Sequence, residues 1–216
     1  QREEYIENAW VKNDIIQPVR YQFNAAPLTD QGKSYNYLIG GLGYKILNEK
    51  EVSVTGLGAA LNVVQIPSTV AINDKTYKVT TIDQSAFSAD KEITDVIFGN
   101  NVTTIEKQAF YQCPNLRTIR FGTKVTKIGS NAFAECAKLK NFTLPASVKR
   151  IDTKAFYQCP AVKTVKINST ALEYVGKKGL AVNKTVTMKL PKKLFTKYQK
   201  MIKASSVYPK TKFIKS

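Results

Sequence analysis

The sequence predicts an α/β solenoid made mostly of short parallel β-strands joined by short helical turns, with about four 23-residue repeats between two caps. The first observation is a block of the form Ile-x-x-x-Ala-Phe at residues 82–87, 105–110, 128–133 and 151–156. The second is that a valine lies three residues before each block and an apolar triplet of the form L-x-x-I-x-F follows it. A unit this short cannot bury its own apolar face, whereas stacked units share one core. The constant spacing therefore predicts a repeat fold.

The residues ahead of the repeats predict a cap and, before it, an extension. Segments 44–46 and 52–54 alternate like strands, and residues 73–75 favour a turn inside the stretch 70–79. We therefore expect an N-terminal cap over residues 40–81. Residues 1–39 lie outside the repeat and are expected to form an extension or linker, with an amphipathic helix over 3–15 and turn-forming residues over 24–34.

Each repeat, over residues 82–167, is expected to contain two extended segments. In the L-x-x-I-x-F segment, Ile119 and Phe121 point inward while Arg120 points out, as the two-residue period of a strand requires. The segment with the pattern V-x-x-I is also extended, and its Ala-Phe continuation is expected to form a tight helical turn. Strands of successive repeats then pair in parallel along the solenoid axis.

A Lys-rich C-terminal cap is expected over residues 168–216. Residues 186–190 read as a strand, and Pro191 is placed to open a short helix. The side chains of Leu194, Tyr198, Met201 and Ile202 share one face of that helix. A last strand near residues 212–214 ends the chain.

The three cysteines follow the repeat. Cys113, Cys136 and Cys159 each lie three residues after the repeat phenylalanine, while Asp90 takes that place in the first copy. Equivalent positions in a solenoid stack roughly 4.8 Å apart. Parallel side chains on adjacent turns do not converge on one point, so a ladder of buried thiols is favoured over a three-thiolate metal site or a disulfide.

Composition limits the chemistry. The chain has 33 Lys and Arg, 16 Asp and Glu, and no His. Without histidine, Ser-His-Asp and Cys-His nucleophile activation and imidazole metal ligands are all excluded. Asp83, Glu106 and Asp152 recur just after the repeat isoleucine, where an exposed turn column is a simpler interpretation than an acid–base pair. We expect no enzyme activity, no catalytic residue, no metal site and no cofactor.

The net charge of +17 does not predict specific nucleic-acid binding. The last 43 residues hold twelve lysines and no acidic residue, so most of the charge belongs to one end. Lysine outnumbers arginine 28 to 5, whereas bidentate reading of guanine or phosphate favours arginine. No apolar run is long enough for a transmembrane segment. The start at Gln1 is expected of a processed secreted protein or an excised fragment.

One candidate binding site is a row of exposed cations. Stacking the repeats places five basic side chains on and beside one sheet face, where solenoids usually present their binding surface. They are Arg117, Arg120, Lys140, Lys163 and Lys166. Such a stripe could recognise an acidic protein or a glycan. The alternative, weighed equally, is a solvated face that resists aggregation.

These residues carry a family resemblance. The pattern over 116–136 and 139–159 resembles the BspA-type leucine-rich repeat of bacterial surface and secreted proteins, and the likeness extends over about residues 40–216. Residues 66–70 resemble the lead-in to the first repeat, and 189–193 resemble the Lys-rich closing segment. The departures are Asp90 in place of a cysteine and a low repeat number.

The resemblance implies a leucine-rich-repeat solenoid and a non-enzymatic binding module, extracellular or on the bacterial cell surface. Its implied partner is an extracellular protein or glycan, including a host matrix protein, with adhesion as the role. Two alternatives stay open. One is a structural spacer within a larger surface protein, and the other is an envelope-associated module held by anionic wall polymers through the C-terminal lysines.

Overall fold

The computed structural model describes residues 29–30, 33–34 and 37–216. Within the first 36 residues it describes two short strands, β1 (Thr29–Asp30) and β2 (Lys33–Ser34), which pair antiparallel. The amphipathic helix predicted over 3–15 lies outside the described residues, as does most of the predicted linker.

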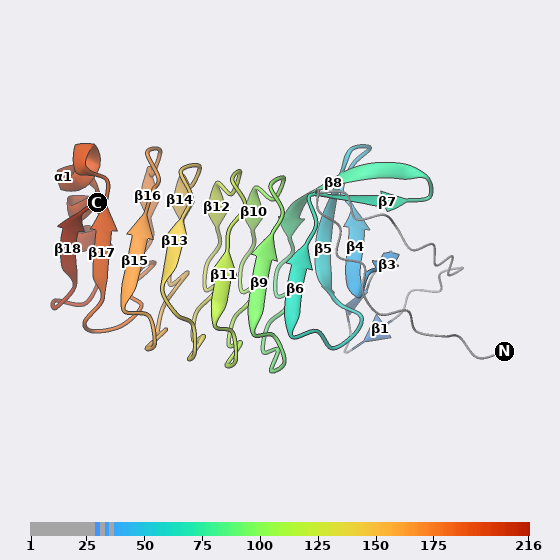
Figure 1. Cartoon of the computed structure of the whole chain (residues 1–216), viewed down its shortest axis with the longest axis horizontal. Helices are drawn as coiled ribbons and strands as arrows, with labels where there is room; N and C mark the ends of the chain where they lie inside the picture. Colours follow the sequence, from blue (N-terminus) through green and yellow to red (C-terminus); the bar gives the residue numbers. More distant parts are fainter. Residues whose placement is uncertain (1–28, 31–32, 35–36) are drawn as a thin grey trace.

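The described chain is a β-solenoid whose strands lie across its long axis in two columns (Figure 1). Column A holds β6 (Val63–Ile66), β9 (Asp95–Phe98), β11 (Thr118–Arg120), β13 (Phe142–Leu144), β15 (Thr164–Ile167), β17 (Thr187–Leu190) and β18 (Lys212–Lys215). Column B holds β5 (Glu51–Leu57), β8 (Lys75–Ile82), β10 (Thr104–Ile105), β12 (Lys127–Ile128), β14 (Arg150–Ile151) and β16 (Tyr174–Val175). The parallel stacking predicted from the repeat is confirmed.

Strand register follows the repeat spacing. In column B, Ile105 lies opposite Ile128, which lies opposite Ile151, which lies opposite Val175. In column A, Ile119 pairs with Val96 one repeat earlier. Because equivalent residues stack directly on one another, a surface residue type that recurs in the sequence becomes a continuous row on the molecule.

The front of the solenoid is closed by the predicted β-rich segment. Strands β3 (Tyr37–Ile39), β4 (Leu42–Ile46) and β5 pair antiparallel, and β5 then pairs in parallel with β8. Strand β7 (Thr69–Ile72) forms a hairpin with β8. Its two turn residues, Asn73 and Asp74, have φ of 49° and 60°, which is the left-handed geometry of a two-residue hairpin turn. The turn predicted at 73–75 is thus confirmed.

The back of the solenoid contains the predicted strand, helix and final strand. After β17 come a 3₁₀ turn (η1, Lys192–Leu194) and the helix α1 (Phe195–Ala204). Tyr198 and Ile202 of α1 are fully buried, and the Tyr198 hydroxyl accepts a hydrogen bond from the Leu172 backbone N–H at 3.0 Å. The helix therefore covers the end of the core, while β18 extends column A.

The repeat array is longer than the four copies predicted. Column A has seven strands in the part of the chain that the structure describes, and column B continues through β16. Val175 and Leu180 repeat the pattern with Gly179 in place of alanine, after a spacing of 24 residues from Ile151 and Phe156. At the other end, Val64 lies opposite Val96 although 32 residues separate them. These copies do not match the sequence pattern, because residues of the last copy are substituted and extra residues lengthen the spacing of both copies.

The predicted helical turns at the Ala-Phe segments are wrong. Gln108 and Gln112, on either side of Ala109 and Phe110, have φ of 58° and 54°, which an α-helix does not permit. The Phe110 N–H donates to the Ala132 carbonyl of the next repeat at 2.7 Å instead of to its own segment. In the described residues, the helical elements are η1 and α1. Inter-repeat hydrogen bonding replaces local helix formation.

The core is built from two ladders. Phe87, Phe110, Phe133 and Phe156 are buried and stack with ring centroids 4.7 to 5.2 Å apart. Beside them the thiols of Cys113, Cys136 and Cys159 are fully buried, and each donates to a phenylalanine carbonyl of the preceding repeat at 3.0 to 3.2 Å. The predicted ladder of thiols is confirmed.

We expect these thiols to be unreactive in the folded protein and to make it sensitive to alkali. Burial raises the pKa of Cys159 from 9.0 to about 12 and that of Cys136 well above its ordinary value. Because the unfolded thiols ionise first, the free energy of unfolding should fall as pH rises above 9.0 and this contribution should be lost near pH 12. Urea unfolding at several pH values measures the decline.

A thiol reagent at pH 8 provides the companion measurement. The native protein should react slowly and the unfolded protein rapidly, because only the thiolate is the nucleophile. Rapid labelling of the native protein would contradict the burial of the ladder.

Candidate functional site

The five cations predicted from the sequence are all exposed on column A. Arg120 on β11 and Lys166 on β15 point away from the core; Arg120 lies between buried Ile119 and half-buried Phe121, and the chain neighbours of Lys166 are both buried. The other three precede β11, β13 and β15 in the chain. We call this set, Arg117, Arg120, Lys140, Lys163 and Lys166, the cationic stripe.

Backbone hydrogen bonds fix the spacing of the stripe. The Arg117 N–H donates to the Thr94 carbonyl at 2.7 Å, and the Lys140 N–H donates to the Arg117 carbonyl at 2.9 Å. In the next step the Asn141 side-chain oxygen accepts from the backbone N–H of Lys163 at 2.9 Å. Successive cations are therefore held about one strand spacing, roughly 4.8 Å, apart along the axis.

A hollow opens at the amino-terminal edge of these strands. Its volume is about 520 Å³, and Arg117, Lys140 and Lys163 of the cationic stripe line it together with Lys138 and Asn141. The Lys138 ammonium donates to the Asn115 side-chain oxygen at 2.7 Å, so it is held at the rim. We call this the first hollow. It is a site where four cations converge on one open depression.

One carboxylate lies at the front end of the stripe. Asp95 of β9 is opposite Thr118 of β11, and its Oδ2 accepts a hydrogen bond from the Thr94 hydroxyl at 2.7 Å. Hydrogen bonds from Thr94 and Thr118 lower the pKa of Asp95, and the charges of the two stripe arginines lower it further. The arginines thus face an ionised carboxylate, whereas among described residues no carboxylate lies within ion-pair distance of Lys140, Lys163 or Lys166.

The structure adds one basic residue, Lys189, that the sequence did not assign to the stripe. Lys189 of β17 lies directly opposite Lys166 of β15 and is exposed. The signal was present, because Thr187-Met188-Lys189 repeats the form of Thr164-Val165-Lys166. It was missed because residues 186–190 were assigned to the cap.

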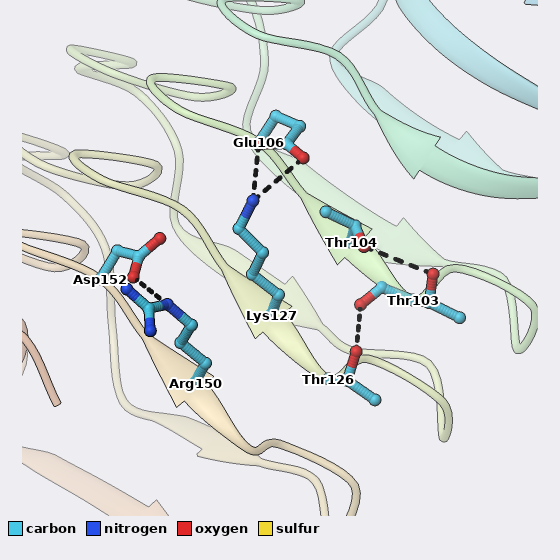
Figure 2. Close-up of polar contacts among 7 residues, drawn as sticks. All are labelled: Thr103, Thr104, Glu106, Thr126, Lys127, Arg150 and Asp152. Atoms are coloured by element: carbon cyan, nitrogen blue, oxygen red, sulfur yellow. Dashed lines mark hydrogen bonds and ion pairs between the residues drawn. The ribbon is translucent and has the colours of Figure 1, made fainter. Parts of the chain in front are cut away.

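Column B presents a different surface (Figure 2). The Lys127 ammonium pairs with the Glu106 carboxylate at 3.0 Å, and the Arg150 guanidinium pairs with Asp152 at 2.6 Å. The Thr103 and Thr104 hydroxyls lie 3.4 Å apart beside these pairs. Of the three carboxylates predicted to form an exposed turn column, Glu106 pairs with a cation of the neighbouring strand β12 and Asp152 pairs with Arg150 of the strand that it follows, while Asp83 is in no ion pair among the described residues. All three are half-buried. Burial raises the pKa of Asp83, and the Glu106 carboxylate raises it further.

Two features are absent from the described part of the chain. No group of three or more His, Cys, Asp or Glu side chains that could hold a metal ion occurs there. Within the same residues, no helix is long and apolar enough to cross a membrane.

The comparisons agree with the repeat architecture. The sequence profile of the BspA type leucine rich repeat region matches residues 61–207 in six copies. A leucine-rich repeat protein from Bacteroides capillosus superposes with a TM-score of 0.55 and 26% identity, over 61% of this chain and 96% of that one. Another, from Bacteroides ovatus, gives 0.53 and 25%, over 73% of this chain and 48% of that one. No curated protein matches. The chain belongs to the BspA-type leucine-rich repeat family.

Proposed function

We propose that this chain is a non-enzymatic binding module, displayed outside a bacterial cell or on its surface, that recognises an acidic protein or glycan through the cationic stripe. Family membership supports a binding role, because repeat solenoids present extended surfaces to partners. Adhesion to a host matrix protein or to another bacterial cell is the role that fits a module of this kind. The ligand contacts we assign are those of the stripe.

One contrast within the molecule carries the proposal. Column B matches Lys127 with Glu106 and Arg150 with Asp152, as a surface selected only for solubility can do. Column A instead holds Lys140, Lys163 and Lys166 in rows with no carboxylate in ion-pair distance among the described residues. Two like charges about 4 Å apart repel by about 1 kcal/mol even in water. An anionic ligand removes that repulsion.

The organisation proposed for the chain follows from the same repeats. We place residues 1–39 in an extension ahead of a repeat domain over 40–216, and strand β3 at the end of that extension already pairs with β4 of the cap. Within that domain, 40–81 and 168–216 cap a central array over 82–167, and each capping region also contributes strands that continue the two columns.

The C-terminal cap supports a second candidate function. Lys197, Lys200 and Lys203 are exposed on α1, and residues 174–216 hold no acidic side chain. This end is suited to nonspecific attraction to anionic wall polymers. Such binding is screened by salt, which separates it from recognition by the stripe.

A binding screen at physiological salt tests the proposal. Matrix proteins and glycans are presented to the purified chain at about 0.15 M salt, where exposed charges are well screened. We expect saturable binding to at least one acidic ligand. Binding only to wall polymers that vanishes at this salt concentration would favour the envelope-associated module, and no saturable binding at all would favour a structural spacer.

A further inference from the structure

We infer that the ligand of the cationic stripe is a linear anionic polysaccharide, carrying sulfate or carboxylate groups, that lies along the solenoid axis across strands β11 to β17. This inference rests on the proposed function and names its ligand class. It follows from the shape of the charged surface, the residue types that make it, and what that surface lacks.

The cationic stripe and Lys189 together form a charged track on column A, and two hollows lie beside it. A second hollow, also about 520 Å³, lies at the carboxyl-terminal edge of the strands and is lined by Lys166, Lys192 and Lys193 together with Asn168 and Thr170. Lys163 lines the first hollow and Lys166 the second, three residues or roughly 10 Å apart along β15. The first hollow lies beside β11, β13 and β15, and the second lies beside β15 and β17, so a chain-like anion that runs along the axis from β11 to β17 can meet both.

The length of the track also favours a polymer. From β11 to β17 there are three strand spacings, or roughly 15 Å along the axis. Lys166 and Lys189 face each other on adjacent strands, so the charge repeats with the solenoid. A polysaccharide is itself a repeat of sugar units with charges at regular intervals. Two repeating structures can align over their whole contact, whereas a globular protein meets such a track at a few points.

The track holds two arginines, Arg117 and Arg120, but lacks the exposed aromatic residues that anchor protein partners. Interface hot spots are enriched in Trp, Tyr and Arg, and lysine is depleted from interface cores. In the described part of the chain, the exposed large hydrophobic residues are Leu47, Val63, Tyr174 and Ile214, and none lies on the column A strands β11, β13, β15 or β17. Exposed Asn141 and Thr143 stand between the cations instead. Amide and hydroxyl groups of this kind can hydrogen-bond to sugar hydroxyls.

The lack of exposed aromatic residues on these strands also argues against a single-stranded nucleic acid as the ligand. Sequence-tolerant binding of single strands combines a basic groove with aromatic side chains on which bases stack. Tyr174 is the aromatic residue among the exposed large hydrophobics of the described residues, and it lies on column B under the Arg150 guanidinium at 4.1 Å. The stripe therefore offers a nucleic acid positive charge, but no exposed aromatic side chain on which its bases could stack.

Titration with a heparin octasaccharide at about 0.15 M salt tests the inference. The test variant is Lys163→Glu/Lys166→Glu, and the matched control is Lys107→Glu/Lys149→Glu, two exposed lysines away from column A. Both variants carry the same net charge. We expect the test variant to lose at least tenfold in affinity and the control to stay within twofold of the wild type. The slope of log K against log salt should fall by roughly one for each lysine lost from the contact.

The other outcomes distinguish failure of this inference from failure of the proposed function. An equal loss in both variants would overturn the inference, because net charge alone would then explain binding. Preference for a single-stranded oligonucleotide of equal charge would overturn it too. If the octasaccharide does not bind but an acidic protein binds saturably and loses affinity in Lys163→Glu/Lys166→Glu, the polysaccharide is wrong and the proposed function stands. If no anionic ligand distinguishes the two variants, the proposed function itself fails.

Discussion

Replacing Phe133 by alanine is expected to lower the free energy of unfolding by roughly 3 to 5 kcal/mol. The Phe133 ring is fully buried and stacks between Phe110 and Phe156, each 5.2 Å away between centroids. It also meets Phe121 edge-on at 5.9 Å. Since a native domain is stable by only about 5 to 15 kcal/mol, this single change removes a large share of the total. Urea unfolding followed by circular dichroism measures it.

The matched control is Phe133→Leu. Leu180 fills the same position in the last copy of the repeat and is fully buried there, so the fold already accommodates leucine at this site. We expect a cost below about 1.5 kcal/mol, because leucine retains most of the buried volume. Equal losses for alanine and leucine would show that the cavity is not what destabilises the protein. A loss below about 1 kcal/mol for alanine would contradict a continuous ring ladder.

Tyr198→Ala is expected to have the second-largest effect, again roughly 3 to 5 kcal/mol as for other large aromatic truncations. Tyr198 is fully buried on α1, and its hydroxyl accepts the Leu172 N–H at 3.0 Å. A solenoid needs its terminal units covered, because the last apolar layer otherwise meets water. Loss of this ring should therefore both destabilise the chain and promote self-association, which light scattering after gel filtration detects.

Tyr198→Phe separates the ring from the hydroxyl. Phenylalanine keeps the ring in the core but leaves the Leu172 N–H without its acceptor, at a cost of about 1 to 3 kcal/mol. We expect this variant to stay monomeric. Self-association of Tyr198→Phe as strong as that of Tyr198→Ala would mean that the hydrogen bond, and not the ring, secures the cap.

The repeat register was predictable because a solenoid converts sequence spacing directly into stacking. A separation of 23 residues sufficed to place Ile105, Ile128 and Ile151 side by side on column B. The same logic placed Arg120 and Lys166 outward and predicted the cysteine ladder. The two-residue turn at Asn73 and Asp74 was predictable because turn-forming side chains at that point favour a tight hairpin.

The missed features depend on contacts between repeats. Gln108 and Gln112 have positive φ because the N–H groups around them donate to the next repeat, and nothing in one repeat alone reveals this. The copy ending at Leu180 was missed because one extra residue and three substitutions, Val175, Gly179 and Leu180, break the pattern. In the same way, Lys189 was assigned to a cap although its pairing with Lys166 places it beside the stripe.

The candidate site was also predictable from the sequence only in part. The sequence placed five cations on one face, because their positions within the repeat are equivalent. It did not reveal that Glu106 pairs with Lys127, since that contact depends on side-chain direction across two strands. The contrast between the two ion pairs of column B and the column A lysines, which have no carboxylate within ion-pair distance among the described residues, therefore emerged only from the three-dimensional arrangement.

One ratio tests most directly whether binding resides in the cationic stripe. For the strongest saturable ligand of the screen, at about 0.15 M salt, the dissociation constant of Arg117→Glu/Lys140→Glu/Lys163→Glu is divided by that of Lys107→Glu/Lys149→Glu/Lys177→Glu. The two variants have equal net charge, and their six positions are all exposed. Three lost charge-assisted contacts predict a ratio of at least roughly 100. A ratio near one, with both variants folded, would contradict the assignment of the stripe as the binding surface.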